Sequence, residues 1–130
     1  MSAVNMLKVI YLTLALTVIV QGSFIQPPSN IVYRRGDHSE GHMNCAITPS
    51  LASGTVLWSV KKYNEATPVV IYARPTFIVR DKYGIQEDAG STGNYTLTIK
   101  NISREDSGTY TCQVGDDVRT ANLTVAGMIS

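Results

Sequence analysis

The stretch Asp106-Ser107-Gly108-Thr109-Tyr110-Thr111-Cys112 carries most of the information about the fold of this 130-residue chain. From Tyr110 onward the residues alternate, so that Tyr110, Cys112 and Val114 share one face of a strand. Gly115-Asp116-Asp117 then has the composition of a tight turn, and residues 120–125 alternate again. This end of the chain is therefore predicted to form two β-strands separated by a turn.

The same short alternations recur through the preceding 80 or so residues. Turn residues bound each of them, which is typical of an all-β sandwich. Prolines 27 and 28 fit an edge strand, where the missing N–H is tolerated. Strands are expected at residues 27–33, 43–47, 56–61, 68–72, 76–79, 82–85, 95–99, 110–114 and 120–125, with a polar loop at 87–93. The prediction is a sandwich of two antiparallel sheets with about nine strands.

The N-terminus has the features of a secretory signal. Lys8 precedes an apolar run of 12 residues, Val9 to Val20. This run is shorter than the ~20 residues that a membrane-spanning helix needs, and it fits the hydrophobic region of a signal peptide. An uncleaved membrane anchor is the alternative. We predict a signal peptide at 1–22, one sandwich domain at 23–126 and a short C-terminal tail at 127–130.

Secretion changes what the two cysteines are expected to do. In an oxidising compartment Cys45 and Cys112 are expected to pair with each other. They lie 67 positions apart, and closing so long a loop is worth ~4 kcal/mol in the chain-entropy model. No second long apolar segment follows the first, so we expect a secreted, extracellular product without membrane insertion after signal cleavage.

Composition argues against several other functions. The formal net charge is +1 and the basic residues are scattered, which gives no basis for a nucleic-acid partner. His38 and His42 precede Cys45, but a metal site needs three or four such ligands. We find no nucleophile–base motif and no glycine-rich phosphate loop. The expectation is therefore a protein that is not an enzyme, with no cofactor and no metal.

The cysteine and tryptophan spacing resembles the immunoglobulin superfamily. Trp58 follows Cys45 by thirteen residues, and the D-x-G-x-Y-x-C run ends at Cys112. The resemblance implies that Trp58 packs on the disulfide and that Tyr110 forms a tyrosine corner. It also implies that Asp106 pairs with a cation, for which Lys82 and Arg80 are the candidates. The 54 positions from Trp58 to Cys112 leave room for a variable-type domain.

A narrower resemblance links the chain to the first domain of invertebrate neural adhesion proteins such as lachesin and amalgam. It rests on Val56-Leu57-Trp58, residues 78–81, residues 94–102 and residues 110–114. Those proteins carry three immunoglobulin domains, and the resemblance implies association through one sheet of the first domain. It therefore implies a role in cell adhesion or recognition.

Three sequons for N-glycosylation are present, at Asn94, Asn101 and Asn122. Alternation turns Asn94 and Asn122 away from the inward Tyr95 and Leu123, and Asn101 lies in a turn. We expect at least one of the three to carry a glycan. The alternative is that these asparagines merely occupy turn and edge positions.

The outward faces of two predicted neighbouring strands form a neutral surface with an aliphatic centre, which suits protein binding. Residues 69–72 are all apolar, so alternation does not decide which of them point outward. Either Val69 and Ile71 or Val70 and Tyr72 belong to the binding surface, and we predict Val69 and Ile71. The expected protein-binding residues are Leu57, Ser59, Lys61, Val69, Ile71, Thr111 and Gln113. The alternative is that Leu57 is a single tolerated exposed leucine.

The expected partner is an extracellular or cell-surface protein, such as an immunoglobulin-domain receptor or a second copy in a homodimer. A different class of function is a soluble immune or defence factor that binds a pathogen surface or a carbohydrate through its loops. A third interpretation is that the chain is a truncated form of a longer adhesion protein. The loops at 48–55 and 115–117 are short and lack tyrosine and tryptophan, which weakens the second interpretation.

Overall fold

The computed structural model describes residues 23–34, 39–51, 54–74, 76–77 and 81–126. The predicted signal peptide at 1–22, the tail at 127–130 and Arg80 lie outside the described residues. Within these ranges eleven strands are formed: β1 (Phe24–Gln26), β2 (Ile31–Arg34), β3 (Glu40–Met43), β4 (Ala46–Ile47), β5 (Val56–Lys62), β6 (Val69–Ala73), β7 (Thr76–Phe77), β8 (Tyr83–Gly84), β9 (Leu97–Lys100), β10 (Gly108–Val114) and β11 (Asp117–Ala126). Two 3₁₀ turns, η1 (Pro49–Leu51) and η2 (Arg104–Asp106), and one short helix, α2 (Ala89–Thr92), complete the elements.

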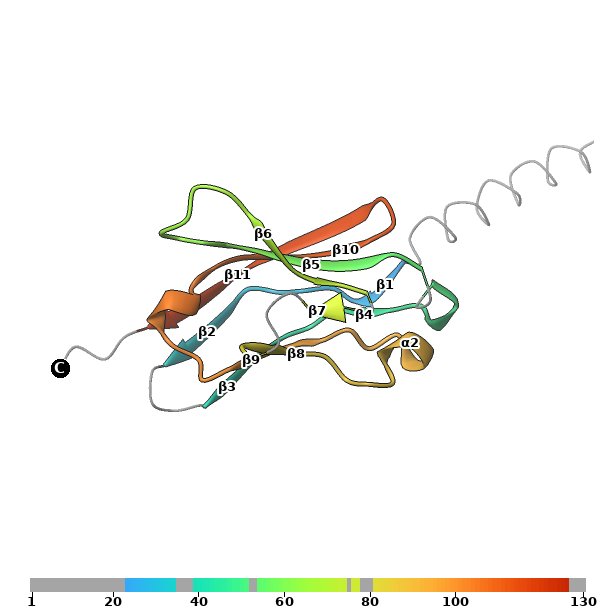
Figure 1. Ribbon diagram of the computed structural model, residues 1–130, viewed down its shortest axis with the longest axis horizontal. Coiled ribbons are helices and arrows are strands. Elements are labelled where there is room, and N and C mark those ends of the chain that lie inside the picture. Colours follow the sequence, from blue (N-terminus) through green and yellow to red (C-terminus); the bar gives the residue numbers. More distant parts are fainter. Residues whose placement is uncertain (1–22, 35–38, 52–53, 75, 78–80, 127–130) are drawn as a thin grey trace, which may run out of the picture.

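The strands form two layers. One layer is a six-stranded sheet in the order β2-β11-β10-β5-β6-β7, and the other contains β3-β9-β8 together with the β1-β4 pair. In the edge-on view of Figure 1, β5, β6 and β10 lie above and β3, β8 and β9 lie below. The predicted all-β, two-sheet sandwich is confirmed, and the strands of Trp58, Val70, Cys112 and Leu123 belong to one sheet.

The core between the layers follows from the alternation. Most residues on the inward parity of β5, β9, β10 and β11 are buried, among them Trp58, Leu97, Tyr110 and Leu123, each with 0% of its surface exposed. Because both sheets present one apolar face, the two faces close on each other and exclude water. The opposite parity of the six-stranded sheet therefore points to solvent.

Eleven strands are found where about nine were predicted because two of the predicted strands are interrupted. Residues 27–30 connect two strands that belong to different layers: β1 pairs with β4 in one layer, and β2 pairs in parallel with β11 in the other. Prolines 27 and 28 lie at this change of sheet, where two consecutive residues without N–H groups end one ladder before the next begins. The strand of Cys45 is likewise split into β3 and β4.

The expected polar loop at 87–93 contains the single-turn helix α2. Gly93 ends this helix in the left-handed region, with φ +80°. A Cβ atom at this position would collide with the carbonyl of Ile47, so both backbone conformation and space favour glycine. This contact fixes α2 against β4 at one end of the sandwich.

Candidate protein-binding face

The candidate site is the solvent side of the six-stranded sheet, which we call the outer face. Four adjacent strands, β11, β10, β5 and β6, supply it, and their inward neighbours are in the core. Its members are the outward-pointing residues through which these four strands pair with one another: Leu57, Ser59, Lys61, Val70, Ala73, Thr109, Thr111, Gln113, Val118, Thr120 and Asn122. Of these eleven residues Lys61 alone is charged.

Strand register arranges the outer face in three rows across the sheet. The first row, next to the β10–β11 turn, contains Val118, Gln113, Leu57 and Ala73. The second row contains Thr120, Thr111, Ser59 and Val70. The third row, at the other end, contains Asn122, Thr109 and Lys61. We refer to the first row as the hairpin end and to the third as the Asn122 end.

Side chains on the outer face are held by cross-strand hydrogen bonds. The hydroxyls of Thr111 and Thr120 lie 3.1 Å apart. Thr109 donates its hydroxyl to Asn122 Oδ1 at 3.0 Å. Such cross-strand pairs each contribute ~0.2–1 kcal/mol to a sheet. Gln113 Nε2 instead donates to the carbonyl of Gly115, in the turn that follows β10, at 2.9 Å. All three bonds restrict side-chain rotation before binding, so a partner has less conformational entropy to remove.

The predicted position of Ile71 on this face is wrong. Trp58 pairs with Tyr72 and Ser59 pairs with Val70, so Ile71 is the extra residue of a bulge in β6. The bulge turns both Ile71 and Tyr72 into the core, at 2% and 5% exposed, and it leaves Val70 on the outer face. Strict alternation cannot reveal such an insertion, because every residue from 69 to 72 is apolar enough for either side.

Val69 is exposed, but it does not belong to the outer face as predicted. It pairs with the inward-pointing Val60 at the open edge of the sheet, with 43% of its surface exposed. Together with Ile71, Lys82 and Tyr83 it lines a small hollow of 160 Å³ between the layers. The remaining predicted members, Leu57, Ser59, Lys61, Thr111 and Gln113, do point outward.

The outer face also includes residues that the sequence interpretation omitted. Val118 and Ala73 complete the hairpin end, and Thr109, Thr120 and Val70 extend the other rows. The alternation that places Asn122 outward also indicates Thr120. Val118 has no such signal, because it directly follows the turn residues Asp116 and Asp117.

Beneath the outer face the disulfide joins the two layers. Cys45 and Cys112 are bonded, and both are fully buried. Trp58 is the cross-strand partner of Cys112, and its indole Nε1 donates to the carbonyl of Tyr95 in the opposite layer at 2.8 Å. The buried indole therefore packs beside the disulfide with its one polar atom satisfied.

The turn before β10 is fixed by Asp106. This buried carboxylate accepts from Lys82 Nζ at 2.8 Å and from the backbone N–H of Ser103 at 2.8 Å. Lys82 is thus the cation, of the two candidates, that the described residues provide. Tyr110 donates its hydroxyl to the carbonyl of Asp106 at 2.6 Å, closing the tyrosine corner. Gly108 has no room for a side chain, because a Cβ would collide with the backbone of Lys61.

Two tyrosines near this carboxylate are hard to ionise. Burial raises the pKa of Tyr83 to about 12, and the nearby charge of Asp106 adds to the rise. Burial also raises the pKa of Tyr110, with further contributions from Tyr83 and Asp106. An anionic tyrosine would lose its hydration between the sheets. These groups therefore serve the fold and lie on the inner side of the sheet.

The three sequon asparagines occupy different surroundings. Asn94 is half-buried, and its Nδ2 donates to Gln86 Oε1 at 3.2 Å. Asn101 is exposed in the turn after β9, with φ +47°, and belongs to the opposite layer. Asn122 is exposed on the outer face. Its Oδ1 accepts from Thr109, and within residues 81–126 no hydrogen bond engages its Nδ2.

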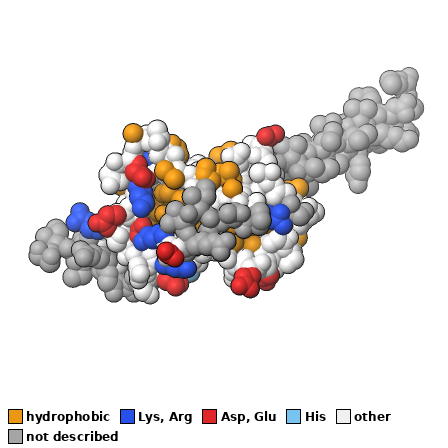
Figure 2. Space-filling model, viewed as in Figure 1, with side chains coloured by type: hydrophobic (Ala, Val, Ile, Leu, Met, Phe, Trp, Pro, Cys, Tyr) orange, Lys and Arg blue, Asp and Glu red, His pale blue; other side chains and the backbone are white. Residues whose placement is uncertain are grey.

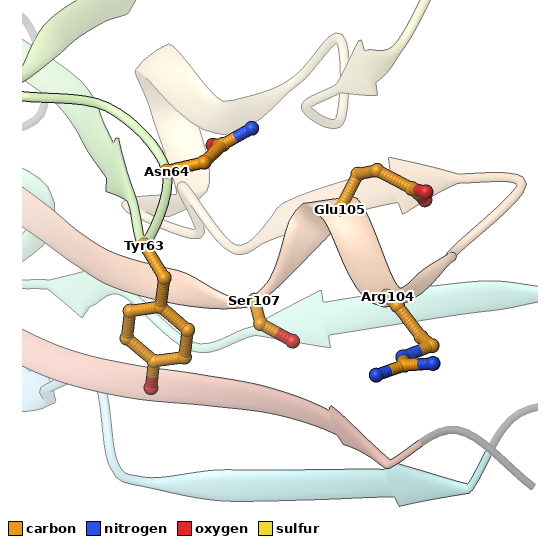
Figure 3. A pocket seen from close by; sticks show the side chains of 5 residues that line it. All are labelled: Tyr63, Asn64, Arg104, Glu105 and Ser107. Carbon is orange, nitrogen blue, oxygen red and sulfur yellow. The ribbon is translucent and has the colours of Figure 1, made fainter. Parts of the chain in front are cut away.

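A polar hollow lies beyond the Asn122 end, at the opposite end of the sandwich from η1 and the turn at 115–117. Its volume is 410 Å³, and it is lined by Tyr63, Asn64, Arg104, Glu105 and Ser107. Figure 3 shows Arg104 and Glu105 on η2 pointing away from each other. The charged groups therefore do not converge on one point, as a small-molecule site would require.

Side chains of different kinds separate on the surface. In Figure 2, hydrophobic side chains gather in the upper middle of the molecule, where Figure 1 places β6 and β5, while charged side chains are more frequent at the lower left. Arg119, at an inward parity of β11, lies over the Phe24 ring, 5.4 Å from its centroid. This contact keeps the guanidinium off the outer face. No helix of the described part of the chain is long and apolar enough to cross a membrane.

Comparison with known proteins agrees with this architecture. The extracellular domains of the voltage-gated sodium channel β4 subunit, solved as parallel homodimers that explain its role in cell–cell adhesion, match with 17% identity and a TM-score of 0.59, covering 82% of this chain and 91% of that one. Titin domain I10 matches with 21% identity and a TM-score of 0.52, covering 79% and 96%.

The titin I9–I11 tandem matches with 19% identity and a TM-score of 0.54, covering 80% of this chain and 32% of that one, so this chain spans about a third of the tandem's length. At these identities the likeness concerns the fold. The model of the immunoglobulin V-set domain matches residues 35–126, most of the chain, and with the disulfide, the buried tryptophan and the tyrosine corner in place the chain belongs to the immunoglobulin V-set family.

Proposed function

We propose that this chain is an extracellular recognition protein that binds another protein, such as an immunoglobulin domain or a second copy of itself, through its outer face. The observation that carries the proposal is a surface of four strands with one charge among eleven residues and an aliphatic cluster at one end. Surfaces depleted of charge at the centre are typical of protein interfaces. A role in adhesion or recognition follows.

Two further points support the proposal. The sodium channel β4 extracellular domains are described as homodimers in cell–cell adhesion, which shows what this fold can do elsewhere. The apolar N-terminal run and the three sequons fit passage through the secretory pathway. We therefore include secretion and glycosylation in the proposal, and we assign no catalytic role.

The test replaces one apolar residue at the hairpin end of the face. Leu57→Asp should weaken binding more than tenfold while the fold remains intact, because a carboxylate would be desolvated in the interface without a partner. Binding is measured as self-association by sedimentation and as avidity-enhanced binding to a panel of purified immunoglobulin-domain ectodomains. Circular dichroism and thermal unfolding report on the fold.

Ile25→Asp is the matched control. Ile25 is 67% exposed on β1, outside the six-stranded sheet, so the same kind of change there should leave binding intact. If Leu57→Asp retains binding while Asp116→Lys in the β10–β11 turn abolishes it, the loops bind the ligand. The defence-factor interpretation then replaces the present one.

A further inference from the structure

The outer face has unequal ends, and the difference concerns what each end can contact. At the hairpin end, Val118 is 48% exposed and lies beside Gln113 and Leu57. At the Asn122 end stands a sequon whose asparagine is exposed on the same face. A glycan is bulky and hydrated, so one attached here would cover the end of the face that carries it.

The geometry of Asn122 is compatible with such a modification in the folded protein. Its Oδ1 accepts from Thr109, and its backbone N–H donates to Asn30 Oδ1 at 2.9 Å. The glycan is joined to Nδ2, which makes no hydrogen bond within residues 81–126. Both of the other contacts therefore survive modification. By contrast, Nδ2 of Asn94 already donates to Gln86, and Asn101 lies outside the six-stranded sheet.

The chemistry of the uncovered face suits a second copy of the same chain. A hydroxyl both donates and accepts hydrogen bonds, so the hydroxyls of Thr120, Thr111 and Ser59 can bond to polar groups of a second copy without needing an opposite charge. The single charge among the eleven residues, Lys61, lies at the Asn122 end, so it stays away from its counterpart when two copies meet at the hairpin end. A charged face would repel its own copy.

The outer face is small, so covering part of it leaves little area for self-association. Four strands spaced ~4.8 Å apart and three rows spaced ~6.8 Å apart give about 400 Å² per copy. A standard interface uses ~800 Å² per partner, so self-association through this face is weak. A glycan over the third row removes about one third of the face from any contact. A glycan at Asn122 therefore has a measurable effect on both affinity and arrangement.

Symmetry restricts the arrangement further. Two copies with parallel strands in full overlap would place each Asn122 end on the other, and antiparallel strands in full overlap would place each Asn122 end on a hairpin end. A glycan obstructs both. An antiparallel contact offset toward the hairpin end remains open, with a two-fold axis along the first row that brings each Val118 opposite its counterpart.

We propose that a glycan on Asn122 confines self-association of this chain to the hairpin end of the outer face, where two copies meet antiparallel across the row of Val118, Gln113 and Leu57. This inference rests on the proposed function, since it assumes that the outer face binds. It adds the partner, a second copy, and the modification that selects the contact.

The experiment compares two substitutions in the sequon of the secreted full chain. Thr124→Ala removes the sequon and leaves Asn122 in place, whereas Thr124→Ser keeps it. Mass spectrometry should find the Asn122 glycan in the wild type and in Thr124→Ser but not in Thr124→Ala. The dissociation constant of the dimer should fall about fivefold in Thr124→Ala alone. Asn101→Asp, which removes a glycan from the opposite layer, should leave the constant unchanged.

Single cysteines then report the arrangement. Under mild oxidation, Val118→Cys should form a disulfide-linked dimer in the glycosylated protein, and Thr109→Cys should do so only when combined with Thr124→Ala. An unmodified Asn122, or equal dimerisation with and without the sequon, overturns this inference. If Leu57→Asp still weakens dimerisation in that case, the proposed function stands; if Leu57→Asp has no effect on any binding, the proposed function fails as well.

Discussion

Four strands of the six-stranded sheet, β5, β6, β10 and β11, contribute residues to both of its faces. Except at the bulge in β6, successive residues along each strand alternate between the two faces, and the two sets of side chains differ in chemistry. Inward, Trp58 and Tyr110 are large and fully buried. Outward, their neighbours Ser59 and Thr111 are small hydroxyl residues in partial contact with solvent. The inner face is packed against the second layer, whereas the outer face has no described layer above it. Substitutions should therefore change stability on one side and association on the other.

The most demanding test of this contrast uses two consecutive residues of β6. Ile71→Asp places a carboxylate in the core and should cost ~4 kcal/mol or more, enough to unfold so small a domain. Val70→Asp lies on the outer face and should change stability by less than ~1 kcal/mol while weakening association. Urea unfolding followed by circular dichroism measures the difference. Equal effects of the two changes would contradict the bulge.

A smaller difference in stability is expected between two consecutive residues of β10, which is separated from β6 by β5. Tyr110→Phe removes the donor to the Asp106 carbonyl and leaves a buried acceptor unsatisfied, at a cost of ~1–2 kcal/mol. Thr111→Val, the next residue, loses a surface hydrogen bond and should cost less than ~0.5 kcal/mol. Thermal unfolding of both variants gives the comparison. A Thr111→Val cost as large as that of Tyr110→Phe would show that the outer hydroxyl pairs stabilise the fold.

The least pronounced effect concerns alkaline pH. Tyr83 has a pKa of about 12 in the folded protein, against an ordinary value of about 10 in the unfolded chain. Above pH 10 the unfolded state therefore loses a proton that the folded state retains, and stability falls as the pH rises toward 12. Tyr83→Phe should flatten this decline in urea titrations between pH 9 and 12. An unchanged slope would mean that Tyr83 does not contribute to it.

Period-two alternation was enough to predict most of this molecule. It placed Trp58, Cys112 and Leu123 inward and Leu57, Thr111 and Gln113 outward, because β5, β10 and β11 pair without a register shift over these residues. The D-x-G-x-Y-x-C run indicated the tyrosine corner and the buried carboxylate. Those features depend on local spacing, which a sequence displays directly.

Features that depend on pairing with distant residues were less accessible. The bulge at Ile71 depends on how β6 pairs with β5. In a run of apolar residues, the sequence alone does not show which residues point inward and which point outward. The split of the first strand into β1 and β2 depends on two different partners, β4 and β11. The predicted loop at 87–93 contains α2 because the backbone at Gly93 packs against Ile47, a contact between residues 46 positions apart.

The parallel pairing of β2 with β11 has a mechanical consequence. Four residue pairs, from Ile31 with Leu123 to Arg34 with Ala126, join β2 to β11, which are neighbours in the six-stranded sheet and its first and last strands in sequence order. Since the strands are parallel, the start of β2 and the end of β11 lie at opposite ends of the ladder. Tension applied between these points loads the ladder's hydrogen bonds together in shear, so they cannot open one after another.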